Sequence, residues 1–117
     1  MNKYGNKPTY VNGLKFDSKK EANRWRELQL LERAGKICEL ERQVAFALAP
    51  SVKYEGAKRA TPALRYVADF CYFEESNARG GQKPRYVVED VKGILTPAYK
   101  IKRHLMLTVH KIEVREV

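Results

Sequence analysis

Two strand-like runs in this chain carry acidic residues where a half-buried strand normally has apolar side chains. One run covers residues 64–73 and contains Asp69, and the other covers residues 86–93 and contains Asp90 and Lys92. Side chains alternate between the two faces of a strand, so Asp90 and Lys92 share one face of the second run. Partly buried carboxylates persist when they are paired or bound to a metal. We therefore expect the two runs to be neighbouring strands whose acids meet.

The residue types in these runs suit metal-assisted chemistry on a phosphate. Carboxylates are hard oxygen ligands for Mg²⁺ or Mn²⁺, which neutralises charge on a phosphate and lowers the pKa of a bound water. Lys92 would orient that water or stabilise the transition state. Glu89 points to the face opposite Asp90, so we take Asp90 as the metal ligand and give Glu89 an accessory role. Glu89 remains the alternative ligand if Asp90 does not bind the metal.

Each of these residues also has an ordinary structural interpretation. Asp69 could face solvent opposite an apolar core face of its strand. Asp90 and Lys92 could form a weak surface pair. The combination favours a metal site, because the acids lie on consecutive strands that both have apolar residues on each face, and a glycine and a basic helix follow.

Glu21 is the third candidate metal ligand. It lies three residues after Ser18, which is the spacing of a helix capping box and requires no catalytic role. It also lies four residues before Trp25 and seven before Leu28, which places it on the inward face of the expected helix. One rotamer cannot fill both roles, so the cap and the metal site are alternatives for the Glu21 side chain.

Length and charge limit the class of protein. The 117 residues indicate a single domain, with residues 1–8 as a basic N-terminal tail. The net charge of +9 makes a polyanion, and above all nucleic acid, the expected partner. An anionic membrane surface is a less expected partner, because no helix has a Lys/Arg-rich face opposite a bare apolar one. No apolar run is long enough to span a bilayer, and the N-terminus has no signal-peptide core. We expect a cytoplasmic protein, and Cys38 and Cys71 to be small apolar residues rather than a disulfide or zinc site.

The order of the expected elements defines an α/β fold. Asn12-Gly13 favours a β-hairpin over residues 10–16, and helices are expected to begin at Ser18 and at Thr96-Pro97. The expected strands are 37–40 and 44–48 (or one bent strand), 64–73, 86–93 and 111–117. This α-β-β-β-α-β order predicts a mixed sheet flanked by helices, with an N-terminal β-hairpin.

Basic residues near these elements are candidates for contact with nucleic acid. A charge run is usually only a solvated face, but with the +9 net charge these residues favour a groove whose affinity depends on salt. The candidates are Lys58, Arg59, Arg85, Lys100, Lys102 and Arg103.

The pattern of Asp69 followed by Asp90-Val91-Lys92 resembles the motif of the PD-(D/E)XK nucleases. From Tyr4 through the 11–22 segment to Gly93, the chain is similar to a family of small phage and prophage proteins with a restriction-endonuclease-like fold, related to the endonuclease subunit of certain cut-and-paste transposons. The resemblance implies catalytic roles for Glu21, Asp69, Asp90 and Lys92, and an accessory role for Gln43. The chain departs from the motif in having Ala68 in place of proline and Asp90 in place of the commoner glutamate.

The resemblance implies a Mg²⁺- or Mn²⁺-dependent endonuclease that hydrolyses phosphodiester bonds of double-stranded or branched DNA. Its expected setting is phage recombination, replication or DNA processing in the cytoplasm of an infected or lysogenic host, with Holliday junctions as one candidate substrate. Two symmetric nicks in a junction would require a homodimer. The alternatives are a basic nucleic-acid-binding module without catalysis and an accessory protein of a phage replication complex.

Overall fold

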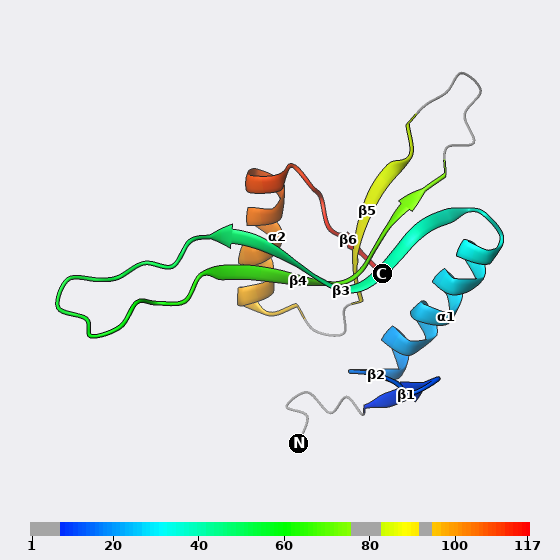
Figure 1. The fold of residues 1–117 in the computed structure, drawn as a ribbon, viewed down its shortest axis with the longest axis horizontal. Helices are drawn as coiled ribbons and strands as arrows, with labels where there is room; N and C mark the ends of the chain where they lie inside the picture. The colour runs from blue at the N-terminus through cyan, green and yellow to red at the C-terminus, as the bar shows by residue number, and fades with distance from the viewer. Residues whose placement is uncertain (1–7, 76–82, 92–94) are drawn as a thin grey trace.

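The computed structural model describes residues 8–75, 83–91 and 95–117 as six strands and two helices (Figure 1). These elements are β1 (Thr9–Val11), β2 (Leu14–Phe16), α1 (Lys19–Arg33), β3 (Ile37–Ala49), β4 (Leu64–Glu74), β5 (Arg85–Asp90), α2 (Pro97–His110) and β6 (Arg115–Glu116). β1 and β2 form a separate antiparallel hairpin. The other strands form one mixed sheet in the order β3-β4-β5-β6, in which only the β5–β6 pair is parallel. The mixed sheet, the two helices and the N-terminal hairpin confirm the predicted fold class.

Local sequence signals set the turn and the helix ends. Asn12 and Gly13 both have positive φ, as a type I′ hairpin turn requires. The Ser18 hydroxyl accepts a hydrogen bond from the Glu21 N–H at 3.1 Å and begins α1. Thr96 caps α2 in the same way, with Pro97 at its first position. The predicted helix starts are confirmed.

The edge strand β3 is a single bent strand rather than two short ones. Glu39 and Gln43 have positive φ, and the pairing with β4 shifts between Cys38 and Glu41. Such irregularities bend a strand without ending it. At the C-terminus the predicted strand 111–117 is reduced to the two residues of β6, because Lys111 takes a left-handed conformation at the end of α2 and redirects the chain.

The buried side chains form two clusters, one under each helix. The α1 cluster consists of Val11, Phe16, Ala22, Leu28, Ile37, Phe70, Tyr72 and Val87. The α2 cluster consists of Leu48, Tyr66, Ala68, Cys71, Val88, Tyr99, Met106 and Val114. Strand β4 contributes to both, and Asp69 lies between Ala68 of one cluster and Phe70 of the other. Position 69 is therefore where the two halves of the core meet.

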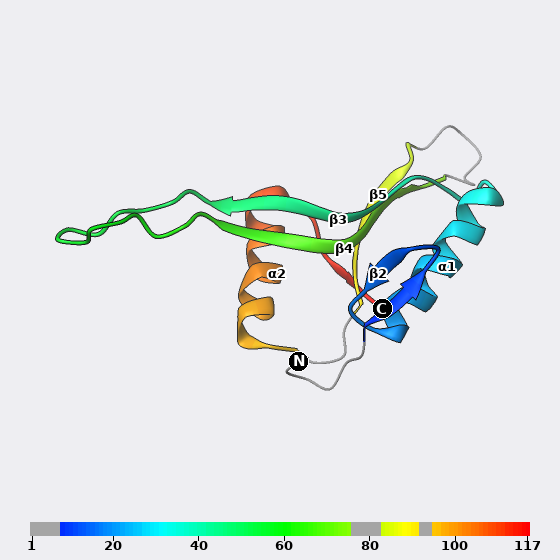
Figure 2. The ribbon, with the colours of Figure 1, turned by 60° about the horizontal axis from the view of Figure 1, so that its bottom comes forward.

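The molecule is elongated because the β3–β4 hairpin projects beyond the rest of the fold (Figure 2). Its principal extents are 58 × 40 × 23 Å. Residues 50–63, which join the two strands, form the projecting end of the hairpin (Figure 1). Neither helix of the described segments is long and apolar enough to cross a membrane.

Candidate functional site

The carboxyl groups of Asp69 and Asp90 lie together at the meeting point of the two clusters. Phe70 of β4 pairs with Glu89 of β5, so the preceding and following residues, Asp69 and Asp90, come side by side. The two carboxyls share a hydrogen bond, and the second oxygen of Asp69 accepts the Val91 N–H at 2.7 Å. Asp69 is half-buried and Asp90 is 4% exposed. The solvent-facing interpretation is therefore wrong for Asp90, whereas Asp69 keeps part of its surface exposed.

The surroundings of Asp69 hold a proton on this pair. Burial is the largest cause that raises the pKa of Asp69, from 3.8 to about 8, and the hydrogen bond with Asp90 and the charge of Glu21 add to it. The Val91 N–H acts in the opposite direction. Two carboxylates in contact cannot both ionise cheaply, so at neutral pH the pair shares one proton. A divalent cation bound to both carboxylates would offset the repulsion between their negative charges.

Tyr66 completes the contacts of Asp90. Its hydroxyl donates to Asp90 Oδ2 at 2.9 Å from within the α2 cluster. Burial, followed by the charge of Asp90, raises the pKa of Tyr66, so this hydroxyl remains a proton donor at physiological pH. Strand alternation alone places Tyr66 on the face opposite Asp69, so the sequence carries no signal for this contact.

Glu21 faces a cavity of about 320 Å³ lined by Lys15, Asp17, Glu21, Arg42 and Gln43. Its backbone N–H bonds the Ser18 cap, whereas its carboxyl accepts a hydrogen bond from Gln43 Nε2 at 3.3 Å. The helix cap and the inward carboxyl are thus compatible, because the backbone fills one role and the side chain the other. Burial raises the pKa of Glu21, and the negative charges of Asp17 and Asp90 raise it further. A hydrogen bond with the Asp17 backbone and the positive charge of Arg42 lower the pKa in part.

Arg42 is a basic residue of this cavity that the sequence analysis did not select. Its guanidinium lies 4.3 Å from the centre of the Phe16 ring, and its Nη2 donates to the Lys15 carbonyl at 2.8 Å. Trp25 lies further away, at 5.9 Å. Arg42 interrupts an alternating apolar series in β3, which is the same signal that identified the aspartates. That signal could have identified Arg42.

The acidic residues do not form a complete metal cage by themselves. Within residues 8–75, 83–91 and 95–117, no three or more His, Cys, Asp or Glu side chains are grouped so that they could hold a metal ion. Asp69 and Asp90 are in contact, while Glu21 acts on both only through its charge. Lys92, predicted beside the aspartates, lies outside the described residues.

Glu89 occupies the opposite face of β5, where its buried carboxylate pairs with the partly exposed Arg24. Arg24 of α1 donates from Nε to Oε1 at 2.8 Å and from Nη2 to Oε2 at 2.6 Å, and the Tyr72 hydroxyl also donates to Oε2. Glu89 has no exposed surface. The Glu89 carboxylate is thus bonded by Arg24 and Tyr72, and these contacts join β5 to α1 and β4.

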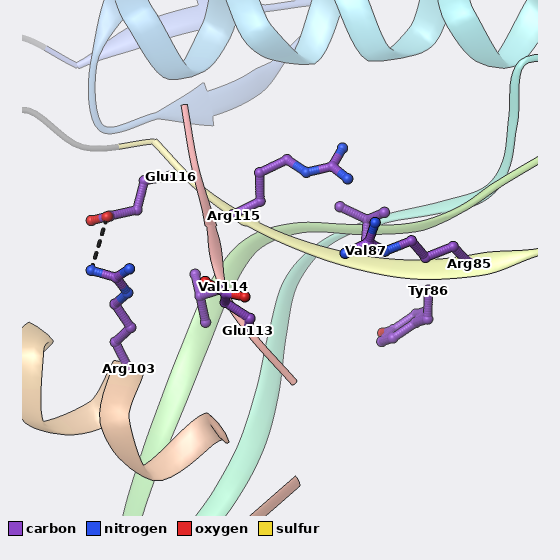
Figure 3. Close-up of a pocket in the computed structure, with 8 residues that line it drawn as sticks. All are labelled: Arg85, Tyr86, Val87, Arg103, Glu113, Val114, Arg115 and Glu116. Atoms are coloured by element: carbon purple, nitrogen blue, oxygen red, sulfur yellow. Dashed lines mark ion pairs between the residues drawn. The ribbon is translucent and has the colours of Figure 1, made fainter. Parts of the chain in front are cut away.

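The predicted nucleic-acid contacts are spread over three places. Lys58 and Arg59 lie at the end of the projecting hairpin, and Lys100 and Lys102 lie on α2. A second cavity of about 330 Å³ beside β6 is lined by Arg85, Tyr86, Val87, Arg103, Glu113, Val114, Arg115 and Glu116 (Figure 3). Arg103 pairs with Glu116 there at 3.0 Å, so part of its charge is neutralised within the protein.

Comparison with known proteins places the chain in a family. Residues 1–116 match the family described as "Protein of unknown function (DUF1064)", and the chain belongs to it. Searches of the curated proteins and of the solved structures found no match.

Proposed function

We propose that this member of the DUF1064 family is a metal-dependent DNA endonuclease. The observation that supports this most directly is the Asp69–Asp90 carboxyl pair, held in hydrogen-bond contact at a half-buried position with the charge of Glu21 acting on it. Buried acids that repel one another cost folding free energy, so their presence favours a functional role over a structural one.

The residues fit Mg²⁺ or Mn²⁺. Mg²⁺ prefers oxygen ligands and is usually bound through one or two carboxylates plus substrate phosphates, with water filling the other positions. Asp69 and Asp90 supply the two carboxylates, so a third protein ligand is not required. When bound, the ion would supply charge neutralisation at the scissile phosphate and a more acidic water.

The remaining side chains have separable roles in this proposal. Tyr66 holds the Asp90 carboxylate in place through its hydroxyl. Gln43 orients the Glu21 carboxylate, which faces the cavity where an attacking water could be held. Arg42 offers a positive charge fixed by its contacts with Phe16, suited to a phosphate oxygen. Lys92, two residues after Asp90, keeps its predicted role of orienting the water.

The substrate class rests on charge and on the resemblance. The +9 net charge favours a polyanion, and the nuclease motif favours DNA, including branched DNA of recombination or replication. A homodimer would be needed if both strands of a junction are cut. Basic residues could equally serve a module that binds DNA without cutting it, so the test must separate binding from cleavage.

The test is nicking of supercoiled plasmid and of a four-way junction by the purified protein. We expect cleavage with Mg²⁺ or Mn²⁺, none with EDTA, and a loss of at least about 100-fold in Asp90→Asn. Binding is measured in parallel with Ca²⁺ by mobility shift. Since most affinity should come from basic residues elsewhere, Asp90→Asn is expected to bind as tightly as wild type or slightly more tightly.

The matched control is Glu41→Gln, which removes an exposed carboxylate from β3 of the same sheet. It should cut and bind as wild type does. A folded wild-type protein that binds DNA but cuts none of these substrates with either metal would support the binding module and reject the nuclease. If folded Asp90→Asn cuts DNA at the wild-type rate, Asp90 is not a catalytic residue.

A further inference from the structure

The structure assigns the projecting end of the β3–β4 hairpin to DNA: we propose that residues 50–63, here called the arm, insert into the major groove of duplex DNA next to the cleavage site. This inference rests on the proposed function for its partner. It adds a specific contact surface, the form of the DNA and the distance between that contact and the aspartate pair.

The arm does not contribute to the core of its own chain. Every residue from Pro50 to Arg65 is exposed except Ala57, which is half-buried. The arm is closed by one β-bridge, in which Val52 and Thr61 exchange backbone hydrogen bonds of 3.2 and 2.6 Å. A two-stranded ribbon of this kind is marginally stable in water by itself. Such a ribbon is expected to gain its stability by contact with another molecule.

The tip of the arm has a defined shape. The Ala57 N–H donates to the Tyr54 carbonyl at 3.0 Å, and Gly56 has φ of +80° at the third position of this turn. Turns of type II require a positive φ at that position, which glycine adopts without strain. A Cβ atom at Gly56 would meet no atom of the described residues within 4 Å, so this side of the tip is open.

The side chains of the arm match the chemistry of a DNA groove. Residues 50–63 contain Lys53, Lys58 and Arg59 against the single acid Glu55. The same segment exposes Tyr54 by 67% of its surface and Val52 by 45%. The major groove admits a two-stranded β-ribbon, with cations on the phosphates at its walls and apolar groups against base edges. A second protein chain would explain the exposed Tyr54 and Val52 but not the excess of positive charge.

The length of the arm fits one turn of duplex. Gly56 precedes Asp69 by thirteen residues of mostly extended chain, which span about 40 Å at roughly 3.3 Å per residue. One turn of B-DNA rises about 34–36 Å. A duplex whose scissile phosphate lies at the aspartates therefore meets the arm about one helical turn away, along the 58 Å axis of the molecule.

The first test is binding of a 24-base-pair duplex in EDTA by Lys58→Gln/Arg59→Gln. Loss of two phosphate contacts should weaken binding about 10- to 100-fold at 150 mM salt and lower the slope of log affinity against log salt by about 2. The control, Arg33→Gln/Lys36→Gln, makes the same charge change on exposed residues at and just after the C-terminal end of α1 and should shift affinity less than about 3-fold. Equal losses in both variants would overturn the proposal.

The second test places a photocrosslinking amino acid at Tyr54. We expect crosslinks to DNA about 10–12 base pairs from the nick, and few from the same group at Leu30, which is 63% exposed at the opposite end. Crosslinks from position 54 to a second protein chain, with DNA affinity unchanged in the arm variant, would instead identify an arm exchanged between copies and overturn the proposal.

These outcomes separate the arm from the nuclease. Binding in EDTA does not depend on cleavage, so loss of affinity in the arm variant supports the arm even if no DNA is cut. If the wild-type protein cuts DNA and the arm variant binds DNA as tightly as wild type, the proposed nuclease function stands and the proposed DNA contact of the arm is rejected.

Discussion

Replacing Asp69 with asparagine should make the protein more stable while abolishing cleavage. The amide oxygen can accept the Val91 N–H, which now bonds the carboxylate at 2.7 Å. The amide nitrogen can donate to Asp90 in place of the proton that the two acids share. The substitution therefore keeps both hydrogen bonds and removes the need either to bind a proton or to carry a second negative charge beside Asp90.

The magnitude follows from the pKa of Asp69, which is raised chiefly by burial from 3.8 to about 8. The folded state holds this proton more tightly than the unfolded chain, so the protein loses stability as the pH rises from 4 to 8. At about 1.4 kcal/mol per pKa unit, the ceiling at pH 8 is roughly 5 kcal/mol. Because the side chain is only half-buried, we expect about 2–3 kcal/mol, or a rise in melting temperature of about 8–12 °C.

The assay is thermal and urea unfolding of wild type and Asp69→Asn at pH 4.5 and pH 8, without divalent metal. The difference should be large at pH 8 and small at pH 4.5, because the cost grows with each pH unit above the unfolded pKa of 3.8 and pH 4.5 is less than one unit above it. The control Glu41→Gln should stay within about 0.5 kcal/mol at both pH values. A destabilised Asp69→Asn at pH 8, or a gain that does not change with pH, would refute the account of a shared proton.

Three further predictions follow from the same contacts. Arg24→Met should lower the free energy of unfolding by about 3–5 kcal/mol, because it leaves Glu89 charged and fully buried, and Arg24→Met/Glu89→Leu should recover much of this loss in urea unfolding. Mg²⁺ affinity should rise up to about tenfold per pH unit until about pH 8, because Asp69 must lose its proton to bind the metal. Calorimetry in buffers of different ionisation enthalpy should detect the released proton. A Mg²⁺ affinity that is flat from pH 6 to 8 would contradict this prediction. Tyr66→Phe should keep the fold but weaken Mg²⁺ binding several-fold by freeing the Asp90 carboxylate, which titration of the folded variant would detect.

The sequence by itself determined the features that depend on neighbouring residues. The Asn12-Gly13 turn and the Ser18 and Thr96 caps follow from backbone preferences of a few consecutive residues. Period-two alternation also predicted that Asp69 and Asp90 would meet once their strands paired, because the face of each side chain is fixed by its position in the strand. These are short-range rules, so a sequence is sufficient to apply them.

Only the tertiary structure decided which partners these side chains find. Tyr66 reaches Asp90 although alternation in β4 places it on the other face, and Arg24 reaches Glu89 across 65 positions of sequence. The bend at Gln43, with its positive φ, brings that amide to Glu21. Such contacts depend on how the strands twist and how α1 crosses the sheet. That geometry is set by packing of the whole core rather than by any local pattern.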